Sequence, residues 1–136
     1  MRALMFCAVN QDRTVRTSEV AEKCNASENH LGQVINTLSH EGYVNTLRGR
    51  GGGLRLAQTP EQISVGEVMR LLEAATPFTE CFHADGNTCP IVSVCKLKPA
   101  LSRALEAFYT ELDRVTLEDL VAGNTGLEQL FGNPAT

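Results

Sequence analysis

Residues 27–57 read SENHLGQVINTLSHEGYVNTLRGRGGGLRLA, and this stretch decides the fold. Ser27 can cap a helix that Gly42 ends. Apolar residues recur along that helix at helical spacing, at Leu31, Val34, Ile35 and Leu38. Two short strands follow, over residues 43–47 and 54–57, joined by a glycine-rich connector. The pattern predicts an amphipathic helix and then a β-hairpin.

Two shorter helices are predicted ahead of this stretch, over residues 2–10 and 18–24. Thr17 or Ser18 can cap the second of them, and Asn25 tolerates the left-handed backbone that the short break after it needs. Three helices followed by a hairpin is the order of a winged helix-turn-helix. On the helix pair alone, a helical hairpin that only packs a core is an equal alternative.

The second half of the chain is expected to extend this domain with helix. Ser64 can cap a fourth helix over residues 65–75, and an apolar stripe from Pro99 predicts one further helix to Val121. At ~1.5 Å per residue that helix would be about 35 Å long, so we expect it to bury its stripe on a second copy. The expected parts are a winged helix-turn-helix over 1–76, a cysteine-rich loop over 77–98, a dimerisation helix over 99–122 and a flexible tail over 123–136. The expected fold class is mainly α with a small β-hairpin.

The composition excludes several classes of protein. The chain has 136 residues, and 43% of them are apolar, which suffices for one small core. Cys7 and Cys24 lie on apolar helix faces and are expected to belong to that core. The longest unbroken apolar run, Ala3–Val9, has seven residues and is too short to cross a membrane. No motif of the type Gly-x-Ser-x-Gly or His-Glu-x-x-His occurs, so we expect a globular, cytoplasmic protein that is not an enzyme.

Charge is divided unevenly along the chain. Residues 1–60 hold seven Lys/Arg against five Asp/Glu, whereas residues 61–136 hold five against eleven. A polyanion would therefore meet the first half. The residues expected to face a DNA major groove lie off the apolar stripe and are Ser27, Glu28, Asn29, His30, Gln33, Asn36 and Thr37. Arg48 and Arg50 flank the glycine tip, where guanidinium groups can follow the duplex backbone or enter a narrow minor groove. Helix and wing together favour double-stranded DNA as the partner.

Three of the five cysteines, Cys81, Cys89 and Cys95, fall within fifteen residues of a segment without periodicity. Thiolates are soft ligands that suit zinc or an iron–sulfur cluster. A structural zinc site prefers four ligands with close Cys-x2-Cys pairs, which are missing here. A fourth zinc ligand is nevertheless available nearby in Glu80, His83 or Asp85. Three interpretations stay open for this segment: a labile cluster suited to a sensor, a zinc site, or thiols without a metal.

Several blocks of the sequence carry a family resemblance. They are Glu28-Asn-His-Leu31, Arg48-Gly-Arg-Gly-Gly-Gly-Leu-Arg-Leu56, Glu80-Cys-Phe82, Asn87-Thr-Cys-Pro-Ile91 and Asp113-Arg-Val-Thr-Leu-Glu-Asp-Leu120. On these blocks the chain resembles the Rrf-type winged-helix transcription regulators over nearly its whole length. Within that family it is similar to the nitric-oxide-sensitive repressors, with iron-responsive regulators as near relatives.

The resemblance implies a homodimer, joined through the helix over 99–121, that binds a palindromic operator. It also implies that Cys81, Cys89 and Cys95 hold an iron–sulfur cluster (2Fe-2S or 4Fe-4S), and that nitric oxide attacks the cluster and releases the repressed DNA. In such relatives the fourth ligand is an Asp near the N-terminus of the other subunit, on a segment ahead of the residue that is Met1 here. Two other functions stay open: an iron-responsive cluster regulator, and a winged-helix adaptor whose cysteines hold structural zinc.

Overall fold

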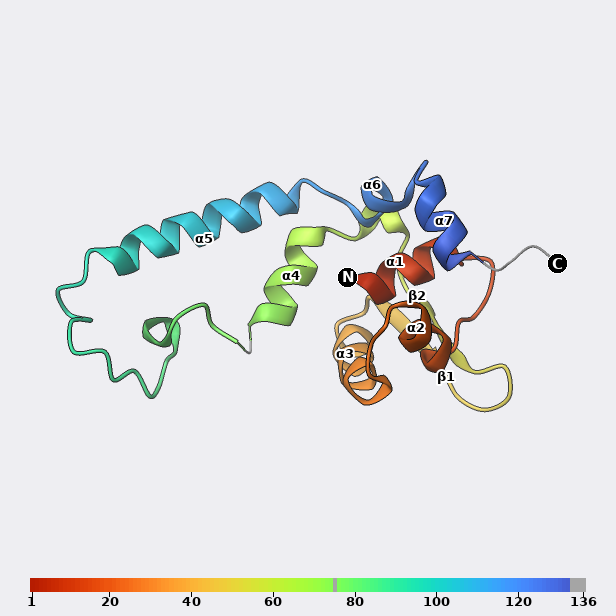
Figure 1. The fold of residues 1–136 in the computed structure, drawn as a ribbon, viewed down its shortest axis with the longest axis horizontal. Coiled ribbons are helices and arrows are strands. Elements are labelled where there is room, and N and C mark those ends of the chain that lie inside the picture. The colour runs from red at the N-terminus through yellow and green to blue at the C-terminus, as the bar shows by residue number, and fades with distance from the viewer. Residues whose placement is uncertain (75, 133–136) are drawn as a thin grey trace.

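The computed structural model describes residues 1–74 and 76–132 and consists of a winged-helix lobe with a projecting arm (Figure 1). The lobe contains α1 (Arg2–Val9), α2 (Thr17–Lys23), α3 (Glu28–His40), β1 (Val44–Leu47), β2 (Gly53–Leu56), the short 3-10 helix η1 (Pro60–Gln62), α6 (Leu117–Val121) and α7 (Thr125–Phe131). The arm contains α4 (Val65–Glu73), the 3-10 helix η2 (Glu80–Phe82) and α5 (Leu97–Asp113). This mainly α architecture with one small hairpin confirms the predicted fold class. Within the part of the chain that the structure describes, no helix is long and apolar enough to cross a membrane.

The core of the lobe forms around α1, which packs against β2, α6 and α7. Its largest fully buried side chains are Phe6, Leu4, Leu38, Leu54, Ile63 and Leu117. The apolar stripe of α3 faces this core through Leu31, Ile35 and Leu38, as the helical spacing predicts. Burial of this stripe leaves the opposite face of α3 in solvent.

The wing is an antiparallel hairpin in which Val44 pairs with Leu56 and Leu47 pairs with Gly53. Val15 adds a short third partner, because Leu54 N donates to Val15 O at 2.8 Å and Val15 N donates to Leu54 O at 3.0 Å. Gly53 has a φ of +150°, and a Cβ atom there would lie 2.1 Å from Val15 O. Only glycine therefore lets the wing come this close to the chain between α1 and α2.

The helix starts were predicted with mixed success. The hydroxyl oxygens of Ser27 and Ser64 cap α3 and α4 as expected, accepting hydrogen bonds from His30 N and Glu67 N. The prediction that Thr17 or Ser18 caps the second helix is wrong, because the residue at the N-cap of α2 is Arg16 and no side chain caps it.

The single helix expected over residues 99–121 is wrong. Helix α5 ends at Asp113, and α6 begins after Thr116. The Thr116 hydroxyl oxygen accepts a hydrogen bond from Asp119 N at 3.1 Å, and Asp119 Oδ2 accepts one from Thr116 N at 2.8 Å. This capping box starts a new helix. Leu120, the last residue of the predicted stripe, packs against the core of the lobe, whereas Phe108 of α5 is exposed, so the apolar stripe divides here between two different surfaces.

The flexible tail expected from residue 123 is also wrong for the residues that form α7. The Asn124 side-chain oxygen accepts a hydrogen bond from Leu127 N at 3.1 Å and starts this helix. Leu127 and Phe131 pack against the core of the lobe, and the Phe131 ring lies 5.3 Å from that of Phe6. The last part of the expected tail, residues 133–136, lies outside the described residues.

Candidate functional site

A short turn joins α2 to α3 and sets the direction in which α3 begins. Asn25 in this turn adopts a φ of +50°, the left-handed backbone that its side chain tolerates. All seven residues predicted to face a major groove are exposed: Ser27, Glu28, Asn29, His30, Gln33, Asn36 and Thr37. The structure thus brings the predicted base-reading residues together on the solvent side of one helix.

Two of these side chains also make local hydrogen bonds. The Ser27 hydroxyl oxygen accepts from His30 N at 3.4 Å, and the Thr37 hydroxyl donates to Gln33 O at 3.2 Å. Amide side chains such as Asn29 and Gln33 carry both a donor and an acceptor, which suits the edge of an adenine base.

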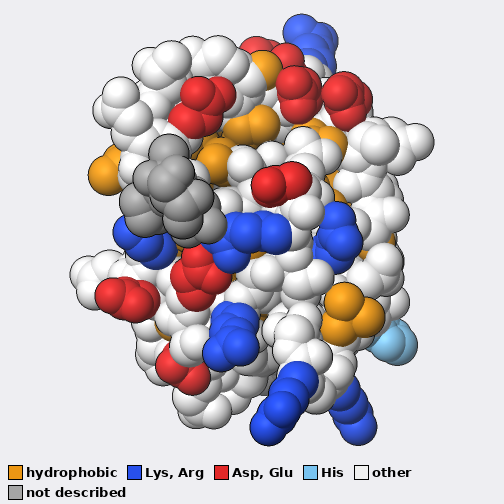
Figure 2. Space-filling view, turned by 90° about the vertical axis from the view of Figure 1, so that its right-hand side faces the viewer, with side chains coloured by type: hydrophobic (Ala, Val, Ile, Leu, Met, Phe, Trp, Pro, Cys, Tyr) orange, Lys and Arg blue, Asp and Glu red, His pale blue; other side chains and the backbone are white. Residues whose placement is uncertain are grey.

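The wing carries its charge at the tip. Arg48 and Arg50 are both exposed between β1 and β2, as predicted. Seen from the wing side, Lys and Arg side chains lie across the middle and at the lower edge of the molecule, while Asp and Glu side chains lie both near the upper edge and at the lower left (Figure 2). Arg16 and Arg55 are also exposed on the lobe, although neither was predicted to belong to the candidate interface. The Arg55 guanidinium donates to Gln11 O at 3.0 Å, which ties β2 to the turn after α1.

A small polar network fixes α2 against α1. The Arg13 guanidinium donates to both carboxylate oxygens of Glu19, at 3.0 Å to Oε2, and to the Asn10 side-chain oxygen at 3.1 Å. The hydrogen bond from Arg13 holds the pKa of Glu19 below its ordinary value and raises the pKa of Arg13. The sequence did not predict this network, because the contact between Arg13 and Glu19 leaves no local pattern.

The three clustered cysteines lie in the loop of the arm, between α4 and α5. Cys81 is in η2, and Cys81, Cys89 and Cys95 are all free thiols that are partly buried. Thr79 Oγ1 lies 3.0 Å from Cys81 Sγ, and Cys89 N donates to Asn87 Oδ1 at 3.0 Å. The donor set therefore fits a soft metal or a cluster in its chemistry, since no disulfide consumes these thiols.

The possible metal ligands of the cysteine loop do not lie together in the structure. Over the described residues, no three His, Cys, Asp or Glu side chains converge where a metal ion could be held. The predicted zinc partners Glu80, His83 and Asp85 thus form no ligand group with the cysteines. Glu80 instead accepts a hydrogen bond from the Thr88 hydroxyl at 3.3 Å. The loop would have to close around any group that the three thiols hold together.

The other two cysteines are core residues, as predicted. Cys7 is 2% exposed and Cys24 is 5% exposed. Burial, and then the nearby Cys24, raise the pKa of Cys7 to about 12, and burial also raises the pKa of Cys24. Both thiols therefore stay protonated at neutral pH and are poor ligands.

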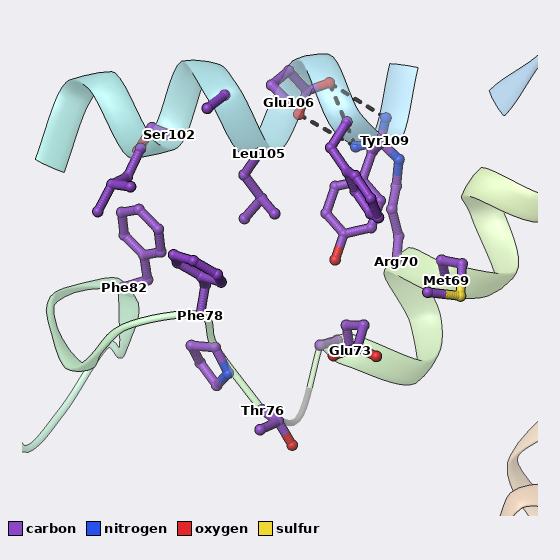
Figure 3. Close-up of a pocket in the computed structure, with 15 residues that line it drawn as sticks. Met69, Arg70, Glu73, Thr76, Phe78, Phe82, Ser102, Leu105, Glu106 and Tyr109 are labelled. Carbon is purple, nitrogen blue, oxygen red and sulfur yellow. Dashed lines mark hydrogen bonds and ion pairs between the residues drawn. The ribbon is translucent and has the colours of Figure 1, made fainter. Parts of the chain in front are cut away.

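The arm leaves a wide apolar surface open. None of the 17 residues of α5, all of them described, is buried. A cavity of about 790 Å³ lies between α4, α5 and the segment before η2, and aromatic side chains point into it (Figure 3). Two of them, Phe78 and Phe108, are 68% and 51% exposed. Apolar side chains of α5 and of the segment before η2 are thus exposed to solvent in the single chain.

Comparisons with known proteins agree with this architecture. Residues 1–123 match the Rrf2 family, described as an iron-dependent transcriptional regulator. The chain is 43% identical over 132 residues to the HTH-type transcriptional regulator NsrR of Bacillus subtilis, covering 96% of this chain and 90% of that protein. It is 40% identical, with the same coverage, to the HTH-type transcriptional regulator NsrR of Geobacillus kaustophilus. Among solved structures it is similar to T. potens IscR, with a TM-score of 0.66 and 28% identity over 88% of this chain and 77% of that one.

Proposed function

The chain belongs to the Rrf2 family of transcriptional regulators, and on this premise we propose that it is a homodimeric repressor whose operator binding depends on an iron–sulfur cluster. The two relatives compared above are named as HTH-type transcriptional regulators and not as enzymes. The observation that carries the proposal is the pairing, in one chain, of an exposed recognition helix with three free thiols in the loop that leads into α5.

In this proposal α3 enters the major groove and the wing lies beside it. Asn29, Gln33 and Asn36 present amides that can pair with base edges. Glu28 and His30 complete the groove-facing surface, and the Ser27 and Thr37 hydroxyls are placed for phosphate contacts. Arg48 and Arg50 reach the adjacent backbone or minor groove. The partner is therefore double-stranded DNA.

The dimer is supported by the exposed surface of the arm. A helix with an apolar stripe but no buried residue is incomplete in a single chain. If a second copy covers α5, the two lobes are related by a twofold axis, and their α3 helices can meet half-sites spaced by about 34 Å, one turn of DNA. A palindromic operator follows from that symmetry.

The proposed ligands are Cys81, Cys89 and Cys95. An iron–sulfur cluster held there would supply a centre that nitric oxide can attack. Because Cys81 lies in η2 while Cys89 and Cys95 lie in the segment between η2 and α5, which has no helix or strand, binding would order this segment and fix the start of α5. Release of the ligands would free the loop and let the two lobes leave the spacing that the operator requires.

The proposal is tested by anaerobic purification of the wild type and of the Cys81→Ser, Cys89→Ser and Cys95→Ser variants. We expect visible absorption, iron and sulfide in the wild type only, with operator binding lost in all three variants. Cys24→Ala, at a buried thiol outside the loop, is the matched control and should keep its iron. Zinc at one ion per chain without visible absorption would overturn the proposal and favour an adaptor. Separate additions of nitric oxide and of an iron chelator decide between a nitric oxide signal and an iron signal.

A further inference from the structure

The arm joins the lobe through a short paired segment rather than through a free linker. Val65 N donates to Val115 O at 2.8 Å, and Leu117 N donates to Ile63 O at 2.9 Å. Ile63 and Leu117 are both fully buried in the lobe. The start of α4 and the end of α5 are therefore rooted together in the core.

Directly beyond this root, α4 and α5 approach each other closely at Gly66. A Cβ atom on Gly66 would lie 2.0 Å from Asp113 Oδ1 and 2.5 Å from Asp113 N. The Ser64 hydroxyl also donates to Asp113 O at 3.2 Å. The separation of the two helices is thus fixed at one end of the arm by contacts with backbone atoms.

One turn further along α4, on the same face as Gly66, the side chain of Arg70 crosses to α5. Its guanidinium donates to Asp113 Oδ2 at 2.7 Å and to Glu106 Oε2 at 3.3 Å, and it lies 4.8 Å from the centre of the Tyr109 ring (Figure 3). Glu106, Tyr109 and Asp113 are spaced by three and four residues, so they form one face of α5 over two turns. Arg70 therefore holds the last two turns of α5 and not a single point of it.

The contacts of Arg70 fix the angle between α4 and α5 more than they add to the free energy of folding. The side chains of Arg70 and Asp113 are 35% and 37% exposed, and ion pairs this open to water add little to the free energy of folding. A planar guanidinium that contacts two carboxylates and one ring nevertheless leaves α5 few orientations relative to α4. We call the contacts of Arg70 with Glu106, Tyr109 and Asp113 the clamp. It lies between the cysteine loop and the lobe, so a conformational change that begins at the loop can reach the lobe only through it.

We infer that Arg70 is a positioning residue that makes α4 and α5 one rigid lever, so that the orientation of α5 sets the orientation of the winged-helix lobe. The inference rests on the proposed function in one respect: Arg70 can affect DNA affinity in this way only if two lobes bind two half-sites. Without the Arg70 contacts, each lobe would still recognise its half-site but would no longer be held at one spacing from its partner.

The test uses the holoprotein and DNA that it selects from a random library, with the spacer between the half-sites shortened or lengthened by one base pair at a time. Arg70→Met keeps the aliphatic part of the side chain and removes the charge. Arg70→Lys keeps the charge but loses the planar guanidinium that contacts both carboxylates. Arg114→Met is the matched control, since Arg114 pairs only with Glu111 of its own helix among the described residues, at 3.8 Å and about 75% exposed.

For Arg70→Met we expect the affinity for the best spacing to fall roughly three- to thirtyfold, the range typical of coupling residues, while affinity for a single half-site is unchanged. Hydrogen exchange should become faster in α4 and in residues 106–113 but not in α1 or α3. For Arg70→Lys, the affinity for the best spacing should lie between those of the wild type and Arg70→Met. Arg114→Met should match the wild type.

Two results would overturn the inference. One is a variant that keeps both the spacing preference and the exchange pattern of the wild type. The other is a variant that loses single half-site binding and thermal stability together, which indicates a purely structural role. If Arg70→Met does not fold, Arg70→Lys decides by the same measurements. If the wild type itself shows no spacing preference, the proposed function is wrong. The hydrogen-exchange data alone then decide whether Arg70 holds α5 against α4.

Discussion

The side-chain amide of Asn10 donates a hydrogen bond of 2.9 Å to the main-chain carbonyl oxygen of Phe131, 121 positions further along the chain. A second hydrogen bond of 2.9 Å goes from the same amide nitrogen to Phe6 O, and Asn10 is only 3% exposed. One buried side chain thus fastens the C-terminal helix α7 to α1, and through Arg13 it also reaches α2.

Replacing this side chain should therefore weaken the whole lobe. For Asn10→Ala we expect a loss of about 1–3 kcal/mol in the free energy of unfolding, because the change leaves buried polar groups without partners. Urea unfolding followed by circular dichroism measures it. Gln11→Ala is the control, because the Gln11 side chain is exposed, and it should change little. Equal stability of the two variants would show that α7 is not fastened in this way.

Two glycine substitutions should change stability in opposite directions. Gly66→Ala places a methyl group against backbone atoms of Asp113 and should destabilise the root of the arm, by an amount typical of overpacking, about 1–3 kcal/mol. Gly32→Ala, in helix α3, meets nothing within 4 Å and should stabilise by about 0.5–1 kcal/mol through helix propensity alone. Thermal unfolding of both variants checks the pair. A stabilising Gly66→Ala would contradict the close approach of α4 and α5.

The ion pair between Arg13 and Glu19 should make stability depend on pH in the acid range. Because the folded protein lowers the pKa of Glu19, the carboxylate contributes stability above its unfolded pKa of about 4.3. That contribution is lost as the pH falls through the lower folded pKa. Glu19→Gln should therefore be less stable than the wild type at pH 7 and approach it below pH 4.

Unfolding midpoints measured across this pH range test the assignment, with Glu22→Gln, at an exposed position of the same helix, as the control. If Glu19→Gln shows the same acid dependence as the wild type, another carboxyl group is responsible.

Contacts of the wing and of the recognition helix should be separable by salt. Arg48→Ala and Arg50→Ala should weaken binding about equally on all sequences, and each should lower the slope of log affinity against log salt by about 1. Asn29→Ala or Gln33→Ala should instead cost about 1–3 kcal/mol on the operator alone. Fluorescence anisotropy on operator and on unrelated DNA separates the two effects. Arg114→Ala, which removes an exposed charge just beyond the end of α5, should change neither; a loss there equal to that at Arg48 would place the DNA on the arm.

Local signals account for the parts of the fold that the sequence predicts correctly. The apolar stripe of α3, its cap at Ser27 and the glycine tip of the wing are each read within a few residues, and each is confirmed. The break before α6 also has a local signal, the capping box from Thr116 to Asp119. The predicted stripe continues past this break to Val115 and Leu120 and masked it, because an apolar residue looks the same whether it faces the lobe or a partner.

The remaining features depend on contacts between distant residues. Arg70 and Asp113 are 43 positions apart, and neither carries a local pattern that points to the other. The same holds for Asn10 and Phe131. The exposure of the candidate DNA-reading residues followed directly from the α3 stripe, whereas the loop of the cysteines has no periodicity from which positions in space can be predicted.

The central claim is that a cluster held by Cys81, Cys89 and Cys95 sets the affinity for the operator. The most direct measurement is an anaerobic titration of one holoprotein sample against labelled operator, before and after stoichiometric nitric oxide, with the visible spectrum recorded alongside. The account predicts tight binding before the addition, and then a loss of affinity that runs parallel to the loss of cluster absorption. Operator affinity that stays constant while the absorption disappears would contradict it.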